Sequence, residues 1–210
     1  MGLQRRPSGL PSRIPGWAWK ALKKPGRHLP RRKPEWFWRW RAWRLGHKIP
    51  IIKPKPRTLS ERAIAMAAQY VGLKEHPAGS NITRFGQWYG ENGVPWCAIY
   101  VSYVLSHSGR AFKYAYVPAI VADARSAKNG LRPLTASKVN AALAAGHPVL
   151  ACYDWNHDGQ ADHVEFVTSV SGATVHAIGG NTGPADWSNG GEVARESRPI
   201  SYVQLFVEVL

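Results

Sequence analysis

From residue 58 onward the chain carries helical patterns first and strand patterns second, and this order constrains its fold more than any other feature. The run Thr58 to Glu61 is a capping box, after which apolar residues recur at helical spacing as far as Gly72. Further elements are predicted in two groups: helices around 82–89, 95–107 and 137–145, and strands at 148–153, 163–170, 173–178, 191–196 and 202–209. Helices followed by strands predict an α+β fold, with N-terminal helices packed on an antiparallel β-sheet.

Residues 1–57 differ in composition from the rest of the chain. They hold 17 Lys or Arg and a single acid, Glu35, so this segment carries +16, whereas residues 58–210 carry −1 from 11 basic and 12 acidic residues. Nine of the 16 prolines also lie in this segment, which is too many for one long helix. We therefore predict two parts: an extended or disordered basic arm at 1–57 and a globular domain at 58–210.

One proline-free stretch of the arm, residues 35–48, suits a short amphipathic helix. Trp36, Trp40 and Trp43 would share one face of it, with arginines interleaved. This composition favours an anionic membrane or wall surface, with the tryptophans at the interface. Two other partners stay open: a protein, such as a virion component, on which the tryptophans would anchor, and nucleic acid, the least favoured of the three.

The sequence contains no signal for membrane insertion or secretion. It has no run of about 18 apolar residues, so no transmembrane helix is predicted. The basic N-terminus lacks the apolar core of roughly 7–15 residues that a secretory signal needs. We expect a protein made and kept in a host cytoplasm, which another agent must release if its target lies outside.

Cys97 and His163 are the candidate catalytic pair. Pro95 suits a first helical turn, so Cys97 would lie where unpaired N–H groups and the helix dipole favour a thiolate. The backbone N–H of Cys97 is also a natural donor to an oxyanion. His163 opens a strand pattern and can accept the thiol proton and return it to a leaving amine. The pair predicts hydrolysis of an amide bond; the alternative is a packed, inert thiol, which is the reading we favour for Cys152.

Residues 154–162 read D-x-N-x-D-G-x-x-D. Oxygen ligands at positions 1, 3, 5 and 9 around a glycine at position 6 have the spacing of an EF-hand-type calcium loop. The predicted ligands are Asp154, Asn156, Asp158, the Gln160 carbonyl and Asp162. A calcium ion here would be structural, because it would fix the strand that presents His163. The alternative is an Asp/Asn/Gly-rich hairpin turn that needs no metal.

Three segments of the globular part resemble the CHAP domain, the cysteine/histidine-dependent amidohydrolase/peptidase family. They are residues 81–105 around Cys97, the run Asp162-His163-Val164, and residues 174–183. The resemblance covers about residues 58–210 and implies a papain-like fold without an organic cofactor. It implies peptidoglycan cleavage, as N-acetylmuramoyl-L-alanine amidase or peptide-crosslink endopeptidase. It also implies Cys97 as nucleophile, His163 as base and Asn181 as the residue that orients the imidazole.

Two positions depart from the CHAP pattern. Many members carry a glutamate two positions before the asparagine, where this chain has Gly179. Glu165, which shares a strand face with His163, stands where the family often has glycine. We hypothesise that Glu165 serves as the acidic neighbour of the imidazole; the alternative is a solvated glutamate at a strand end. Glu165 also falls at position 12 of the calcium loop, and it cannot readily serve both sites.

The leading prediction is a peptidoglycan hydrolase that acts on the bacterial cell wall after release, as a phage endolysin or a virion-associated lysin. A catalytically inactive, CHAP-like docking component of a virion or envelope assembly is the alternative, because Gly179 lacks a carboxylate. A cationic membrane-disrupting protein is a third reading, and it would need only the arm.

Overall fold

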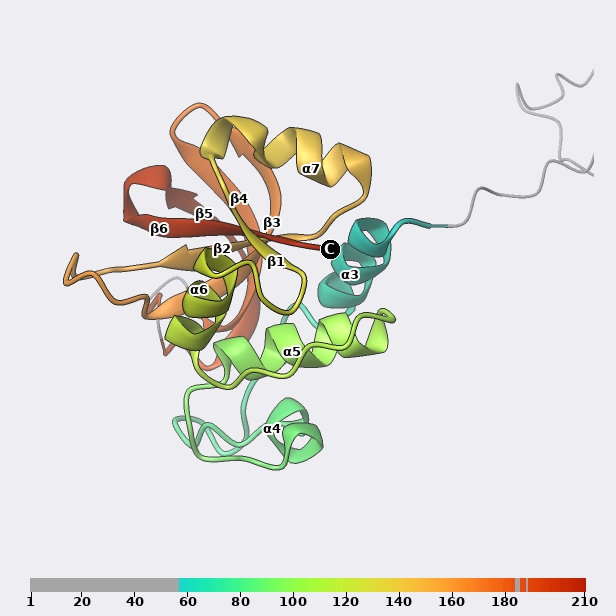
Figure 1. Ribbon diagram of the computed structural model, residues 1–210. Coiled ribbons are helices and arrows are strands. Elements are labelled where there is room, and N and C mark those ends of the chain that lie inside the picture. Colours follow the sequence, from blue (N-terminus) through green and yellow to red (C-terminus); the bar gives the residue numbers. More distant parts are fainter. Residues whose placement is uncertain (1–56, 184–185, 188) are drawn as a thin grey trace, which may run out of the picture. The chain divides into compact units, whose positions relative to one another are not determined.

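The computed structural model describes residues 57–183, 186–187 and 189–210 (Figure 1). Contacts divide the chain into two units, Met1–Pro54 and Lys55–Leu210. The predicted arm, with its helix at 35–48, lies outside the described residues except for Arg57. The fold and the site below belong to the second unit.

The described part contains five α-helices and a six-stranded sheet; four helices and five strands follow the predicted order, and one unpredicted helix and one unpredicted strand come before the last helix. The helices are α3 (Leu59–Gln69), α4 (Arg84–Tyr89), α5 (Cys97–His107), α6 (Val117–Arg125) and α7 (Val139–Ala145). The strands are β1 (Leu131–Leu134), β2 (Val149–Tyr153), β3 (His163–Ser171), β4 (Thr174–Thr182), β5 (Glu192–Pro199) and β6 (Val203–Val209). The strand order is β1-β6-β2-β3-β4-β5 and all neighbours are antiparallel, which confirms the α+β class.

Helix α3 begins at the predicted capping box. The Thr58 hydroxyl accepts from the Glu61 N–H at 3.2 Å, and the Glu61 carboxylate accepts from the Thr58 N–H at 2.8 Å. Two N–H groups that the helix leaves unpaired are thereby satisfied. Local sequence alone therefore accounts for where the globular part begins.

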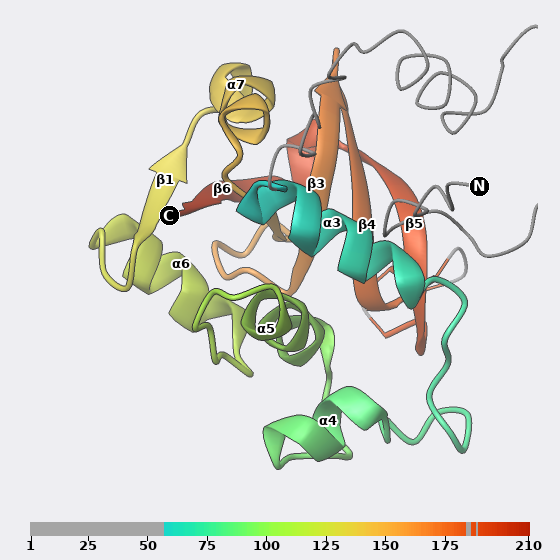
Figure 2. The ribbon, with the colours of Figure 1, turned by 90° about the vertical axis from the view of Figure 1, so that its right-hand side faces the viewer.

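The helices cover both faces of the sheet. Helices α3 and α5 pack on β3 and β4, and α7 packs on β2 and β3 from the opposite face (Figures 1 and 2). Alternate residues of β2 face the two layers: Leu150 and Cys152 belong to the α5 core, whereas Ala151 and Tyr153 belong to the α7 core. Helix α4 packs on the outer side of α5 (Figure 2).

Helix α6 and strand β1 occupy a stretch for which no element is predicted from the sequence. Helix α6 has a proline in its first turn, where the missing N–H costs little. Only four of its residues are buried, so little of it shows as an apolar face in the sequence. Strand β1 contains Pro133, which an edge strand tolerates and a central strand does not. Among the described helices, none has the length and hydropathy needed to cross a bilayer.

Candidate active site

Cys97 is the first residue of α5, and Trp96 is the N-cap. The predicted helix begins two residues earlier, so Pro95 precedes the cap instead of occupying the first turn. No side chain caps this end, which leaves its backbone N–H groups and the positive end of the dipole beside the Cys97 sulfur. Cys97 is a free thiol and is only 4 % exposed.

Tight packing holds the start of α5 in place. A Cβ atom on Gly180 of β4 would lie 2.6 Å from Tyr100 and 2.7 Å from Trp96, so only glycine allows this approach of strand to helix. Trp96 stacks on Phe85 at 5.6 Å between ring centroids, and its indole N–H donates to Glu75 at 3.4 Å. Cys97, the candidate nucleophile, therefore stands on a rigid element.

His163, the first residue of β3, lies next to Cys97 and is fully buried. Its Nε2 is 3.4 Å from Glu165 Oε1, an ion-pair distance. Burial acts to lower the pKa of His163, but the Cys97 sulfur and the Glu165 carboxylate outweigh it and raise this pKa to about 9. These contacts favour the protonated form of the ring. Nε2 faces Glu165, and Nδ1 has no hydrogen-bond partner among the described residues.

Glu165 is fully buried between His163 and Arg198. Arg198 Nη2 donates to Glu165 Oε1 at 3.3 Å and to the Thr182 hydroxyl at 2.6 Å. Burial acts to raise the pKa of Glu165, but contacts with His163, Arg198 and Tyr153 hold it below its ordinary value. An ionised carboxylate is therefore kept beside the imidazolium, which it stabilises.

The two departures from the CHAP pattern, Glu165 and Gly179, are cross-strand partners. They pair directly in the β3–β4 register. A Cβ atom on Gly179 would lie 2.7 Å from Glu165 Cγ and 2.8 Å from Oε1, so the Glu165 side chain fills the space over Gly179. A carboxylate attached at either position would project into the same region.

Asn181, at the end of β4, makes a different contact from the one expected. Its Nδ2 donates to Asn189 Oδ1 at 3.0 Å, and no described residue pairs with its Oδ1. The imidazole neighbour in the described part of the chain is Glu165. The role of Asn181 in orienting the imidazole therefore stays a prediction.

Arg198 is a site residue that the sequence analysis missed. The predicted strand ends at Glu196, so Arg198 fell in a turn, whereas β5 continues to Pro199. The signal was available, because an arginine near a strand end with an acidic residue two positions earlier is a candidate for an ion pair. Arg198 Nη1 does contact Glu196 Oε2 at 3.5 Å.

Unpaired polar atoms concentrate around His163. Nine buried side-chain N and O atoms in the described residues have no hydrogen-bond partner, and six of them belong to Tyr153, Trp155, His163, Glu165 and Arg198. Such a concentration is typical of a site that solvent or a ligand completes.

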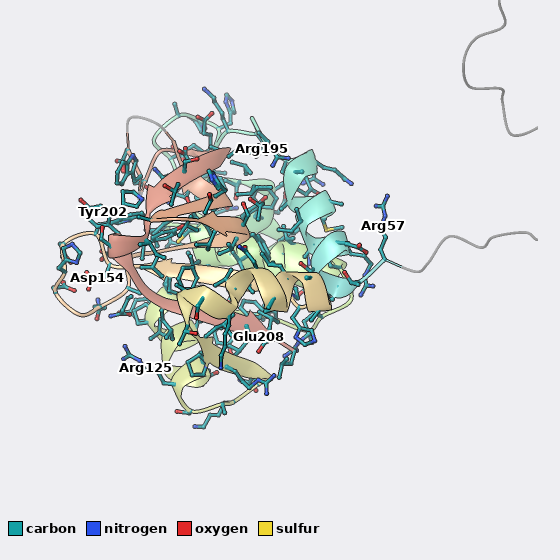
Figure 3. All side chains as sticks on the ribbon, turned by 90° about the horizontal axis from the view of Figure 1, so that it is seen from above. Arg57, Arg125, Asp154, Arg195, Tyr202 and Glu208 are labelled. Atoms are coloured by element: carbon teal, nitrogen blue, oxygen red, sulfur yellow. The ribbon has the colours of Figure 1, made fainter. Side chains whose placement is uncertain are left out.

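The predicted calcium loop connects β2 to β3, with Asp154 next to Tyr202 at the edge of the domain (Figure 3). Asp154 accepts from the N–H groups of Asp158 at 3.2 Å and Gly159 at 2.8 Å. Asp162 instead accepts from the Trp155 N–H at 2.8 Å, and Glu165 is engaged by Arg198.

No three His, Cys, Asp or Glu side chains of the described residues converge as a metal site would require. Asp154, Asp158 and Asp162 each accept a backbone N–H within the loop, so these bonds exclude none of them as a ligand. The residue types of the loop suit calcium. Calcium binding stays a prediction.

Titration calorimetry tests whether this loop binds calcium. If the loop binds calcium, chelator-treated protein gives saturable heat and its melting temperature rises with calcium, because a ligand at 100 times its Kd stabilises the folded state by about 2.7 kcal/mol. Asp158→Ala should weaken both effects, whereas Asp123→Ala, on α6, should leave them unchanged. The absence of heat and of any melting shift at millimolar calcium would reject the site.

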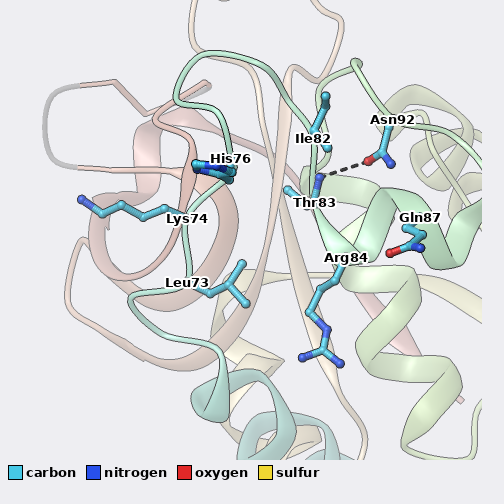
Figure 4. Close-up of a pocket in the computed structure, with 8 residues that line it drawn as sticks. All are labelled: Leu73, Lys74, His76, Ile82, Thr83, Arg84, Gln87 and Asn92. Carbon is cyan, nitrogen blue, oxygen red and sulfur yellow. Dashed lines mark hydrogen bonds between the residues drawn. The ribbon is translucent and has the colours of Figure 1, made fainter.

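A recess elsewhere in the domain has no predicted catalytic residue in its wall. Figure 4 shows its lining: Leu73, Lys74, His76, Ile82, Thr83, Arg84, Gln87 and Asn92. Asn92 Oδ1 accepts from the Thr83 N–H at 3.0 Å, which ties the loop to the start of α4. None of the lining residues belongs to the candidate active site, so the recess is separate from it.

Comparison with protein-family models, curated proteins and solved structures finds no match to this chain. The site accordingly rests on the chain's own residues. The structure brings together Cys97, His163 and Glu165 and adds Arg198, while Asn181 contacts Asn189.

Proposed function

We propose that this protein hydrolyses amide bonds through a cysteine thiolate. The observation that carries the proposal is Cys97 at the start of α5, beside a buried His163 whose protonated form Glu165 stabilises. A thiolate paired with an imidazolium is ready both to attack a carbonyl and to protonate a leaving amine. The CHAP resemblance, with its implied papain-like fold, supports the same chemistry.

The reaction has two steps. The Cys97 thiolate attacks the amide carbonyl carbon, and the resulting oxyanion accepts from the Cys97 backbone N–H. The C–N bond then breaks as His163 gives its proton to the leaving amine, which leaves a thioester and a neutral imidazole. His163 next takes a proton from water while the water oxygen attacks the thioester; the carboxylic acid departs and the thiolate–imidazolium pair is restored.

Peptidoglycan is the proposed substrate. The resemblance of residues 81–105, 162–164 and 174–183 to CHAP domains supports it. The charge of +16 on residues 1–57 also supports it, because a cationic segment accumulates on anionic wall polymer or membrane. We place its action at the bacterial cell wall, in a phage or virion lysin. The alternative of an inactive docking component loses weight, since Glu165 supplies the carboxylate that Gly179 lacks.

Mass spectrometry of digested wall material tests the proposal. The full chain is incubated with purified peptidoglycan, and the released fragments are sequenced. Stem peptides with a new N-terminal amine and sugar chains freed of peptide would identify an amidase, whereas separated crosslinks would identify an endopeptidase. Intact peptidoglycan of every common crosslink type, after prolonged incubation with folded protein, would refute the proposal.

The pH profile should show an alkaline limb near pH 9. The pKa of His163 is raised to about 9, so its proton, needed by the leaving amine, is lost as pH rises through that value. The same raised pKa stabilises the fold: the contribution is complete below the ordinary value of about 6.5 and disappears as pH rises through about 9. Measuring kcat/KM and melting temperature from pH 6 to 10 checks both; a limb below pH 7.5 would contradict the assignment.

A further inference from the structure

A cluster of aromatic rings adjoins the catalytic histidine. The Trp155 ring lies 6.0 Å from the His163 ring and 5.3 Å from Trp187, and Trp187 lies 6.0 Å from Tyr202, between centroids. His157 stacks on the far side, 5.2 Å from Tyr202. Trp155 and His157 come from the loop after β2, and Tyr202 comes from the turn before β6. Aromatic rings from separated segments are thus gathered next to the imidazole.

Trp187 is the accessible member of this cluster. It is 38 % exposed, the only exposed one among the four tryptophans that the structure describes. Arg198 covers one face of the ring, with its guanidinium carbon 4.8 Å from the centroid. The exposed part of the Trp187 side chain is open to a ligand. An indole exposed beside a catalytic group is an energetic anchor for binding.

Trp187 is also tied to the catalytic residues. Its carbonyl accepts from the Thr182 hydroxyl at 3.0 Å, and the same hydroxyl accepts from Arg198 at 2.6 Å. Arg198 in turn holds Glu165, the partner of His163. A ligand on Trp187 is consequently held at a defined position relative to the imidazole, which is what a substrate-positioning contact requires.

We propose that Trp187 and Tyr202, backed by Trp155, bind a sugar ring of the substrate. A pyranose presents C–H groups of partial positive charge, which are attracted to the negative face of an indole. The Trp155 ring, whose Nε1 is buried, lies behind Trp187 at 5.3 Å between centroids and supports it. An exposed indole ring matches the flat C–H face of a pyranose.

The inference rests on the proposed function and refines it. Trp187 is two ring-to-ring contacts from His163, of 5.3 and 6.0 Å, a span that a sugar attached close to the scissile amide can cover. The enzyme should therefore cleave the amide that joins the stem peptide to the glycan, in preference to crosslinks between peptides.

The test is calorimetric titration of the full-length Cys97→Ala protein with a β-1,4-linked tetramer of N-acetylglucosamine. We expect saturable binding that weakens at least tenfold when Trp187→Ala is added and is largely retained with Trp187→Phe. Tyr116, exposed at the N-cap of α6, gives the matched control: Tyr116→Ala should leave the affinity unchanged. Melting temperatures within a few degrees of the parent establish that each variant is folded.

Three outcomes would overturn the inference: no binding of the tetramer, equal affinity with and without the Trp187 ring, or a Trp187-dependent affinity for the free stem peptide that exceeds the affinity for the sugar. The titration needs no turnover, so it separates this inference from the proposed function. Sugar binding without wall cleavage would refute only the hydrolase, and cleavage without sugar binding would refute only the sugar site.

Discussion

Cys97→Ala should abolish amide hydrolysis, with a loss of at least about 10³-fold in kcat/KM. The thiolate is the only group proposed to bond to the carbonyl carbon, and alanine leaves α5 and its N-terminus intact. Release of muropeptides from purified peptidoglycan, measured over hours at matched protein concentration, gives the rate. The variant should stay folded, but its melting temperature at neutral pH should fall, because His163 loses the contribution of Cys97 to its raised pKa.

Cys152→Ala is the matched control, because this second cysteine is fully buried on β2. Burial and the neighbouring Cys97 raise the pKa of the Cys152 thiol far above its ordinary value, which keeps it protonated and inert. Its removal should cost some stability but no chemistry. Lysis that survives Cys97→Ala would instead assign the activity to the cationic arm, and equal losses in both variants would remove the case for Cys97 as nucleophile.

Activity should be lost when Glu165 is replaced by glycine, and it should return when the facing residue, Gly179, is replaced by glutamate in the same chain. Glu165→Gly removes the charge that supports the imidazolium, and we expect a fall of about 10²-fold or more in kcat/KM. Gly179→Glu alone should also impair the enzyme, because a Cβ at this position meets the Glu165 side chain at 2.7 Å. The double variant Glu165→Gly/Gly179→Glu returns one carboxylate to the same space, so it should regain at least tenfold over either single change.

Such a rescue is a coupling that independent sites would not show. Glu165→Gln separates charge from shape: turnover should fall strongly, the fold should persist, and the alkaline limb should move below pH 9, because the pKa of His163 loses its anionic support. The rates are measured from pH 6 to 10. A near-normal rate for Glu165→Gln, or a double variant no better than the worse single one, would remove Glu165 from the catalytic arrangement.

The fold class was predictable because its signals are local. The capping box at Thr58, the apolar spacing that follows, the apolar run of β2 and the alternation at the start of β3 each report a backbone geometry within a few residues. The same locality placed Cys97 at a helix start with an error of two residues. Helix α6 and strand β1 escaped prediction since their prolines resemble breakers unless the first turn of a helix or the edge of a sheet is known.

Glu165 marks the limit of local reasoning. Its position in the chain suits a calcium loop and an imidazole partner equally well, and no nearby residue distinguishes the two. The choice depends on Arg198, which is 33 residues away in the chain and reaches the carboxylate only because β5 lies beside β4 in the sheet. Periodicity reveals which segments become strands and helices. Which buried charges meet is decided by strand order and packing, since a buried carboxylate is stable only where the assembled fold supplies cations to pair with it.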